Sequence, residues 1–117
     1  MASQAAVFAA IASPRRREIL RLVWKQEQTA GAIYRAMPDV TFGAVSLQLK
    51  SLVEAGLVEA RAEHRNRWYR ARPEALGSLA ETLERMWDDA LWRLKLEAEL
   101  EQSRRGPRPA KKKVKRR

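Results

Sequence analysis

At 117 residues and a net charge of +10, the chain has room for one domain whose basic surface suits a polyanion. Its hydrophobic share of 45% is enough for a small core, and the absence of cysteine excludes disulfides and thiolate metal sites. No stretch approaches the ~20 apolar residues that cross a bilayer, and the first residues lack a basic leader, so we expect a soluble cytoplasmic protein without membrane contact.

Two helices are predicted near the start of the chain. The first covers residues 4–12, an alanine-rich stretch whose larger apolar side chains recur at helical spacing: Val7, Phe8 and Ile11. Ser13 and Pro14 then give an N-cap followed by proline at the first helical position, which is a favoured helix start. We expect this second helix to end near Lys25.

Positive charge gathers at the start of the second helix, on Arg15, Arg16 and Arg17. Basic side chains at this end oppose the helix dipole, although the position is also simply exposed. Because the local electrostatics are unfavourable, we favour a partner anion here.

Two closely linked helices follow. Thr29 is placed to cap a third helix that Pro38-Asp39 ends. Thr41 is placed to cap a fourth, over residues 41–55, which Gly56 closes as a left-handed C-terminal cap. The apolar face of the fourth helix is predicted to enter the core through Val45, Leu49, Leu52 and Val53. A tight turn between two such helices outlines a helix-turn-helix.

The pattern then changes to the alternation of a β-hairpin. Leu57 to Arg61 and Arg67 to Ala71 are predicted strands, and Glu63 to Asn66 form a polar turn between them. A hairpin with arginine at its tip, directly after a helix-turn-helix, is a wing. The sequence therefore predicts a mainly α fold with a small β-hairpin: a winged helix-turn-helix with N- and C-terminal dimerisation helices.

A long helix is predicted from Pro73 to about Gln102. One broad face carries Leu76, Leu79, Leu83, Trp87, Leu91 and Leu94. The stripe is too wide for one small domain to cover, so we interpret it as core plus a homodimer interface rather than a ligand box. The predicted interface joins it to the first helix through Val7, Phe8, Ile11, Leu79, Leu83, Trp87, Leu91 and Leu94.

Charge divides the chain into three blocks. Residues 1–72 carry a balance of +6, residues 73–102 a balance of −5, and residues 103–117 hold nine basic and no acidic side chains. We expect a domain over residues 1–102 and a disordered basic tail over residues 103–117. The tail lysines Lys111, Lys112 and Lys113 are predicted to add sequence-independent affinity for DNA, and an RNA-binding or solubilising tail is the alternative.

The outward face of the fourth helix is free to enter a major groove of double-stranded DNA, because its apolar face is committed to the core. The Thr41 hydroxyl and nearby backbone N–H groups suit a phosphate, as does Lys50. Ser46 and Gln48 suit bases, and glutamine suits adenine. Phe42 either contacts a thymine methyl, which we favour, or packs inward. The predicted contacts of this helix are Thr41, Phe42, Gly43, Ser46, Leu47, Gln48 and Lys50.

Four arginines complete the predicted DNA surface. Arg65 and Arg67 lie at or near the hairpin tip, where they can reach a minor groove or its phosphates, and solvated hairpin charge is the alternative. Arg15 and Arg16 flank the phosphate backbone. Of Trp68 and Tyr69, which alternate across the hairpin, one is expected to pack into the core.

Three segments are distinctive when taken together: Ile11 to Leu20, Thr29 to Ile33 and, most specifically, Ala44 to Val58. They resemble the ArsR/SmtB family of bacterial winged-helix repressors, and the resemblance covers roughly residues 5–100. It implies a homodimer that pairs through its terminal helices and represses by blocking a promoter.

Two departures from the family pattern matter. The family's metal sensors use cysteine and histidine ligands, but this chain has no cysteine and its one histidine, His64, falls at the wing tip. An acidic site among Asp88, Asp89 and Glu97 is outweighed by an ordinary solvated face, so the chain resembles the metal-independent branch, with no metal and no cofactor. In the fourth helix, Phe42, Gly43 and Leu47 replace more polar residues, so the operator sequence does not transfer from relatives.

Two functions follow from this reading of the residues. The first is a sequence-specific homodimeric repressor that occludes a promoter. The second is an architectural, nucleoid-associated protein with the same fold, which the weakly polar fourth helix and the basic tail favour. An enzyme is not expected, because the chain lacks a cysteine nucleophile and a phosphate-binding glycine loop.

Overall fold

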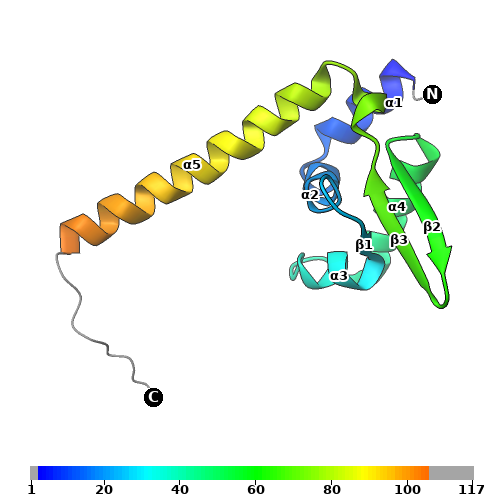
Figure 1. Ribbon diagram of the computed structural model, residues 1–117, viewed down its shortest axis with the longest axis horizontal. Helices are drawn as coiled ribbons and strands as arrows, with labels where there is room; N and C mark the ends of the chain where they lie inside the picture. The colour runs from blue at the N-terminus through cyan, green and yellow to red at the C-terminus, as the bar shows by residue number, and fades with distance from the viewer. Residues whose placement is uncertain (1–2, 106–117) are drawn as a thin grey trace. The chain divides into compact units, whose positions relative to one another are not determined.

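The computed structural model describes residues 3–105, with the backbone alone at residues 92, 100 and 102–105. It divides into two units, Met1–Ala80 and Glu81–Arg117. Figure 1 shows the first unit as a small helical bundle beside a narrow antiparallel sheet, and the second as the greater part of one long helix.

Four α-helices build the first unit: α1 (Gln4–Ala12), α2 (Pro14–Leu22), α3 (Ala30–Arg35) and α4 (Phe42–Glu54). Each begins at a serine or threonine whose hydroxyl accepts a backbone N–H at 3.1 to 3.3 Å. Such a bond satisfies one of the N–H groups that a helix start leaves without a partner. The predicted caps at Ser13, Thr29 and Thr41 are therefore confirmed.

The ends of the helices follow local chemistry less closely. Gly56 has a φ of 81° and closes α4 as predicted. Helix α2 ends at Leu22, before the predicted Lys25. The Val23 carbonyl accepts a hydrogen bond from the Ala71 N–H at 3.0 Å, so this carbonyl joins the sheet instead of continuing the helix.

The sheet contains the predicted hairpin and a third strand. β2 (Val58–Glu63) and β3 (Asn66–Ala71) pair antiparallel from Val58 opposite Ala71 to Glu63 opposite Asn66. β1 (Gln28–Thr29) pairs with β3, which gives the order β1-β3-β2. The sequence did not reveal β1, because two residues are too short to show a period.

The core lies between the helices and the base of the hairpin. Its fully buried side chains are Ile19, Leu20, Val23, Ile33, Val45, Leu49, Leu52, Leu57 and Val58. Burying each of these contributes about 1.5–3 kcal/mol. The predicted inner face of α4 is confirmed at Val45, Leu49 and Leu52, whereas Val53 is only half-buried.

The expected continuous helix from Pro73 is wrong. A short 3₁₀ helix, η1 (Pro73–Leu76), ends at Gly77, whose φ of 60° favours glycine, and α5 (Leu79–Arg105) begins after it. α5 also continues past the predicted end at Gln102. The predicted tail beyond Arg105, with Lys111, Lys112 and Lys113, lies outside the described residues. None of the helices within residues 3–105 has the length and apolar character of a membrane span.

Candidate nucleic-acid interface

The predicted DNA-contacting residues of α4 occupy its outer face. Leu47 is 65% exposed, and six of the seven are exposed: Thr41, Phe42, Gly43, Ser46, Leu47 and Lys50. A methyl group added at Gly43 would meet no atom within 4 Å, so packing inside the chain does not require glycine there. The first turns of α4 therefore present an exposed surface, which is open at Gly43 and carries the large side chains of Phe42 and Leu47.

Phe42 combines both of its predicted interpretations. Its ring is 49% exposed, and it packs edge-to-face on Tyr34 of α3, with ring centroids 5.6 Å apart and planes at 81°. This is a favourable aromatic geometry. The contact joins the two helices of the helix-turn-helix at the exposed surface. Tyr34 was missed by the sequence reasoning, because an aromatic on the outer face of a short helix has no distinctive spacing.

Gln48 is held inside the chain rather than left free for a base. Its Oε1 accepts a hydrogen bond from the Arg16 Nε at 2.7 Å, and Gln48 is half-buried. Arg16 also donates through Nη1 to the Ala9 carbonyl at 3.4 Å. One arginine thus connects α1, α2 and α4, and the Gln48 amide nitrogen is the group left for a partner.

Two of the arginines at the start of α2 donate to backbone carbonyls at the end of α1. Arg17 donates through Nη1 to the Ile11 carbonyl at 2.6 Å, and Arg16 bonds the Ala9 carbonyl. The last carbonyls of α1 lack helical partners and carry the negative end of its dipole. This end of α1 therefore supplies a partially negative partner for Arg16 and Arg17, whereas Arg15 is exposed and makes no hydrogen bond to the described part of α1.

An ion-pair cluster around Arg61 lies on the outer face of the hairpin. The Arg61 guanidinium donates to both carboxylate oxygens of Glu27, at 2.7 and 2.8 Å, and to Glu63 at 2.8 Å. It also lies 5.7 Å from the ring centroid of Trp68. Hydrogen bonding from Arg61 lowers the pKa of the Glu27 carboxyl. The cluster fastens the hairpin to the chain just before β1.

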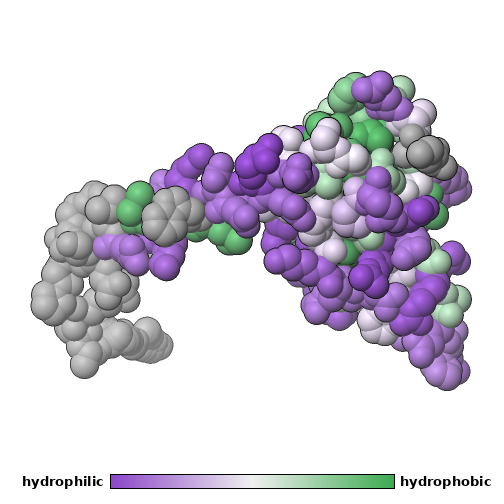
Figure 2. Space-filling view, turned by 45° about the horizontal axis from the view of Figure 1, so that its top comes forward, coloured by the Kyte–Doolittle hydropathy of each residue, from purple (hydrophilic) through white to green (hydrophobic). Residues whose placement is uncertain are grey.

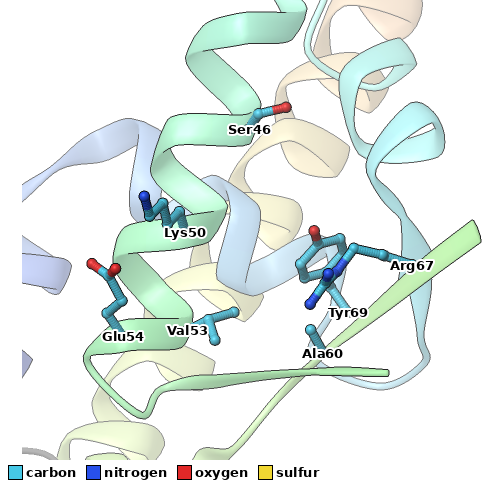
Figure 3. Close-up of a pocket in the computed structure, with 7 residues that line it drawn as sticks. All are labelled: Ser46, Lys50, Val53, Glu54, Ala60, Arg67 and Tyr69. Carbon is cyan, nitrogen blue, oxygen red and sulfur yellow. The ribbon is translucent and has the colours of Figure 1, made fainter. Parts of the chain in front are cut away.

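The inner face of the hairpin is open and turns toward α4. A cleft of about 380 Å³ separates them, and Figure 3 shows Arg67 and Tyr69 directed from β3 toward α4. Arg65 occupies the exposed turn beside His64, whose φ is 59°. Trp68 and Tyr69 are both half-buried, so the expected burial of one of them is wrong. The cleft is lined by Ser46, Lys50, Val53, Glu54, Ala60, Arg67 and Tyr69.

The surface at the tip of the hairpin is hydrophilic (Figure 2), and every residue from Arg61 to Arg67 is exposed. Such a tip has no role in the core, because its side chains are polar or small and none is covered by another element. Apart from Arg61 and Glu63, which are bonded to one another, the tip is therefore available to a partner that carries charge or hydrogen-bonding groups.

The predicted dimer residues divide by exposure. Phe8 is 50%, Leu91 61% and Leu94 63% exposed, so each presents apolar surface to solvent in the single chain. Ile11, Leu79 and Trp87 are half-buried. Val7 and Leu83 are buried in the single chain, so they have little surface left for a partner.

The sequence predicts no residue that binds a metal ion or a cofactor. Within the described part of the chain, no group of three or more histidine and carboxylate side chains is arranged to hold a metal ion.

A second depression, of about 310 Å³, lies between the start of α2 and the turn after α3, and its lining includes Arg15, Glu18 and Asp39.

Comparison with known proteins covers most of the chain. A helix-turn-helix domain family matches residues 11–61. The homodimeric winged helix-turn-helix DNA-binding domain of a possible ArsR-family transcriptional regulator from Mycobacterium bovis is 33% identical, over 73% of this chain and 78% of that chain, with a TM-score of 0.61. No curated protein sequence matches the chain.

Two further solved structures show the same similarity. An ArsR-like transcriptional regulator from Rhodococcus sp. RHA1 is 37% identical, over 81% of this chain and 89% of that chain, with a TM-score of 0.60. HlyU from Vibrio cholerae is 25% identical, over 71% of this chain and 89% of that chain, with a TM-score of 0.63. The winged-helix architecture is thus shared over the helices and the hairpin.

Proposed function

Because the chain belongs to the ArsR family of winged-helix transcriptional regulators, and is therefore a DNA-binding regulator rather than an enzyme, we propose that it acts as a homodimeric repressor. It binds a promoter at the bacterial nucleoid through α4 and the wing, and so blocks transcription by occupying the site. The observation that carries this proposal is the division of α4 into a buried apolar face and an open outer face.

Base discrimination is assigned to the outer face of α4. A recognition helix contacts base edges through its N-terminal residues, and Ser46 and Leu47 are exposed in this half of α4. Gln48 adds one sharper expectation. A bidentate bond to adenine uses both the amide oxygen and the amide nitrogen, but Arg16 already bonds the oxygen. The oxygen keeps one lone pair but is held by Arg16, so we expect Gln48 to contact DNA by donating through its nitrogen to an acceptor, either a base edge or a phosphate.

Affinity is assigned to cations around that face. Lys50 is exposed on α4, Arg65 lies in the turn of the hairpin, and Arg15 is exposed at the start of α2. Cations that contact phosphates release counterions and contribute affinity that is independent of sequence. The basic residues beyond Arg105, including Lys111, Lys112 and Lys113, add to the same term.

Pairing of two copies is supported by apolar exposure in each unit. Phe8 on α1 and Leu91 and Leu94 on α5 are at least half exposed. Exposed large apolar side chains of this kind are typical of an interface, and a twofold dimer would place two α4 helices in successive major grooves, about 34–36 Å apart. The Mycobacterium bovis relative is itself homodimeric.

An architectural role is the second candidate. Phe42, Gly43 and Leu47 offer few hydrogen bonds to bases, and residues 103–117 carry nine basic side chains. A protein of this kind coats DNA with little preference for sequence, whereas a repressor keeps a specificity ratio at physiological salt.

Mapping of bound genomic sites separates the two candidates. We expect the full chain and a variant ending at Arg105, where α5 ends, to occupy the same palindromic motif, with the shorter chain bound more weakly. Purified protein should prefer that motif over random DNA by at least about a thousandfold. Binding of the full chain without a motif, together with loss of most binding on truncation, would instead support the architectural role.

A further inference from the structure

We propose that the cleft between α4 and the inner face of the hairpin is a phosphate seat, filled in the complex by a backbone phosphate of the DNA that α4 contacts. The inference rests on the proposed function and deepens it. It assigns a ligand, a phosphate group, to a cleft for which the proposed function names none. The seat is the 380 Å³ cleft lined by seven residues from α4, β2 and β3 (Figure 3).

The lining consists mainly of groups that donate hydrogen bonds. Arg67 and Tyr69 come from β3, and Ser46 and Lys50 come from α4. An arginine guanidinium, a lysine ammonium and two hydroxyls match the acceptor oxygens of a phosphate, and the guanidinium fork favours it further. Glu54 is the one carboxylate of the lining, so the cleft keeps a positive balance.

Lys50 and Arg67 line the cleft without an acceptor inside the described chain, whereas several other arginines are already bonded. Arg16, Arg17, Arg21, Arg61 and Arg72 each bond an acceptor inside the chain. Neither Lys50 nor Arg67 has a hydrogen-bond or ion-pair partner among the described residues, and the same holds for the hydroxyls of Ser46 and Tyr69. Ser46, Lys50 and Arg67 are exposed, so their donors are hydrated in the free chain and can exchange water for the oxygens of an external anion.

The position of the cleft identifies the source of that anion. A helix with its side chains is about 10–12 Å across, and a major groove is about 12 Å wide. A helix inside the groove therefore has sugar-phosphate backbone along both sides. The hairpin flanks α4, and Ser46 and Lys50 belong both to the exposed face of α4 and to the cleft, so the backbone strand beside α4 passes the mouth of the cleft.

Apolar groups at the back of the cleft strengthen the seat. Val53 projects from α4 toward Arg67 and Tyr69, and Ala60 of β2 lies beside them (Figure 3). They offer no hydrogen bond to water, and charge-assisted bonds are stronger where water is partly excluded. The volume is large enough for a phosphate together with part of its sugar.

The test is the salt dependence of DNA binding by Arg67→Gln, with Arg70→Gln as the matched control. Arg70 is exposed on the same strand but on the opposite face of the hairpin, so both variants remove one positive charge. We expect Arg67→Gln to weaken binding to motif and random duplexes alike, about tenfold near physiological salt, and to lower the slope of log K against log salt by about 1. Arg70→Gln should change neither by more than about twofold.

A second arm distinguishes the source of the phosphate. Inorganic phosphate is titrated into the full chain at constant ionic strength, and backbone amide shifts of α4 and β3 are followed by NMR. If Arg67→Gln but not Arg70→Gln weakens DNA binding, absence of saturable shifts assigns the seat to the DNA backbone. Saturable shifts that Arg67→Gln abolishes also support a phosphate seat, with free phosphate as a competing occupant. Equal effects of Arg67→Gln and Arg70→Gln on DNA binding, with no phosphate shifts, would overturn the inference.

Failure of the seat and failure of the proposed function give different results. If the wild-type chain shows no preference for any motif, the repressor proposal fails, but the difference between the two variants on random duplex still decides the seat. Circular dichroism should show an unchanged fold for both variants, because each replaced side chain is exposed.

Discussion

The two faces of the wing hairpin use the same residue type in opposite ways. On the outer face, Arg61 is bonded to Glu27 and Glu63 and lies over Trp68. On the inner face, Arg67 has no partner within the described residues and faces the cleft beside α4. The strand alternation that separates them is a local property, but their bonding is not. Net charge alone does not separate these two arginines, whereas their bonding and the hairpin face on which each lies do.

The largest effect on DNA affinity is expected when the cleft between α4 and the hairpin loses both of its cations, Lys50 and Arg67. Lys50→Gln combined with Arg67→Gln should weaken DNA binding on the order of 100-fold at physiological salt and lower the salt slope by about 2, because two phosphate contacts are lost. The measurement is fluorescence anisotropy on motif and random duplexes at several salt concentrations. A control double variant, Arg21→Gln with Arg70→Gln, removes the same charge and should keep the wild-type slope.

Gly43 extends the open surface to the first turn of α4, and its replacement should separate stability from binding. Gly43→Ala meets no atom in the chain, so it should raise the free energy of unfolding by about 0.5–1 kcal/mol through helix propensity. The added methyl group should weaken motif binding several-fold by blocking close approach. Thermal unfolding and anisotropy on one preparation test both. A more stable variant with unchanged affinity would show that DNA does not approach this turn.

The outer face of the hairpin, where Arg61 is bonded to Glu27, is tested by removing a negative charge. Electrostatics alone predicts that Glu27→Gln binds DNA more tightly, since it takes a carboxylate away from a polyanion. We expect the opposite, about twofold to threefold weaker binding, because Arg61 loses its bidentate partner and the hairpin is held less firmly. Tighter binding would mean that the cluster around Arg61 does not position the wing.

The same cluster should respond to acid. The pKa of Glu27 is lowered in the folded chain by hydrogen bonding from Arg61, so its contribution to stability is present above its ordinary value of 4.5. That contribution is lost as the pH falls through the lowered pKa and the carboxyl takes up a proton. The difference in unfolding free energy between wild type and Glu27→Gln should therefore be constant near neutral pH and should vanish in acid. A difference that grows below pH 4.5 would contradict this assignment.

The smallest effect is expected for Arg16, which, like Arg61, is already hydrogen-bonded inside the chain. Arg16→Met removes the bond to Gln48 and should lower the free energy of unfolding by about 1 kcal/mol, with no change in salt slope. The matched variant Arg15→Met replaces an exposed neighbour and should leave stability nearly unchanged. A slope reduced by about 1 in Arg16→Met would restore the phosphate contact that the sequence predicted for this residue.

Local chemistry determined most of the fold in advance. Ser13, Thr29 and Thr41 begin helices because a hydroxyl at that position satisfies a free N–H, and Gly56 ends α4 because it adopts a positive φ without strain. The alternation from Val58 to Ala71 identified the hairpin. All of these signals involve residues close together in the chain, so they can be recognised before any tertiary contact is known.

Tertiary structure decided which predicted residues are free to act. Arg16 meets Gln48 32 positions away, and Arg61 meets Glu27 34 positions away, so no local pattern shows that these cations are already bonded. The break at Gly77 was hidden within a broad apolar stripe, and β1 exists only because β3 pairs with it. The sequence by itself determined a basic winged helix, because caps and periods are local. The fold decided that Arg16 and Arg61 already have acceptors inside the chain, whereas Lys50 and Arg67 have none among the described residues, because pairing depends on which distant segments the core brings together.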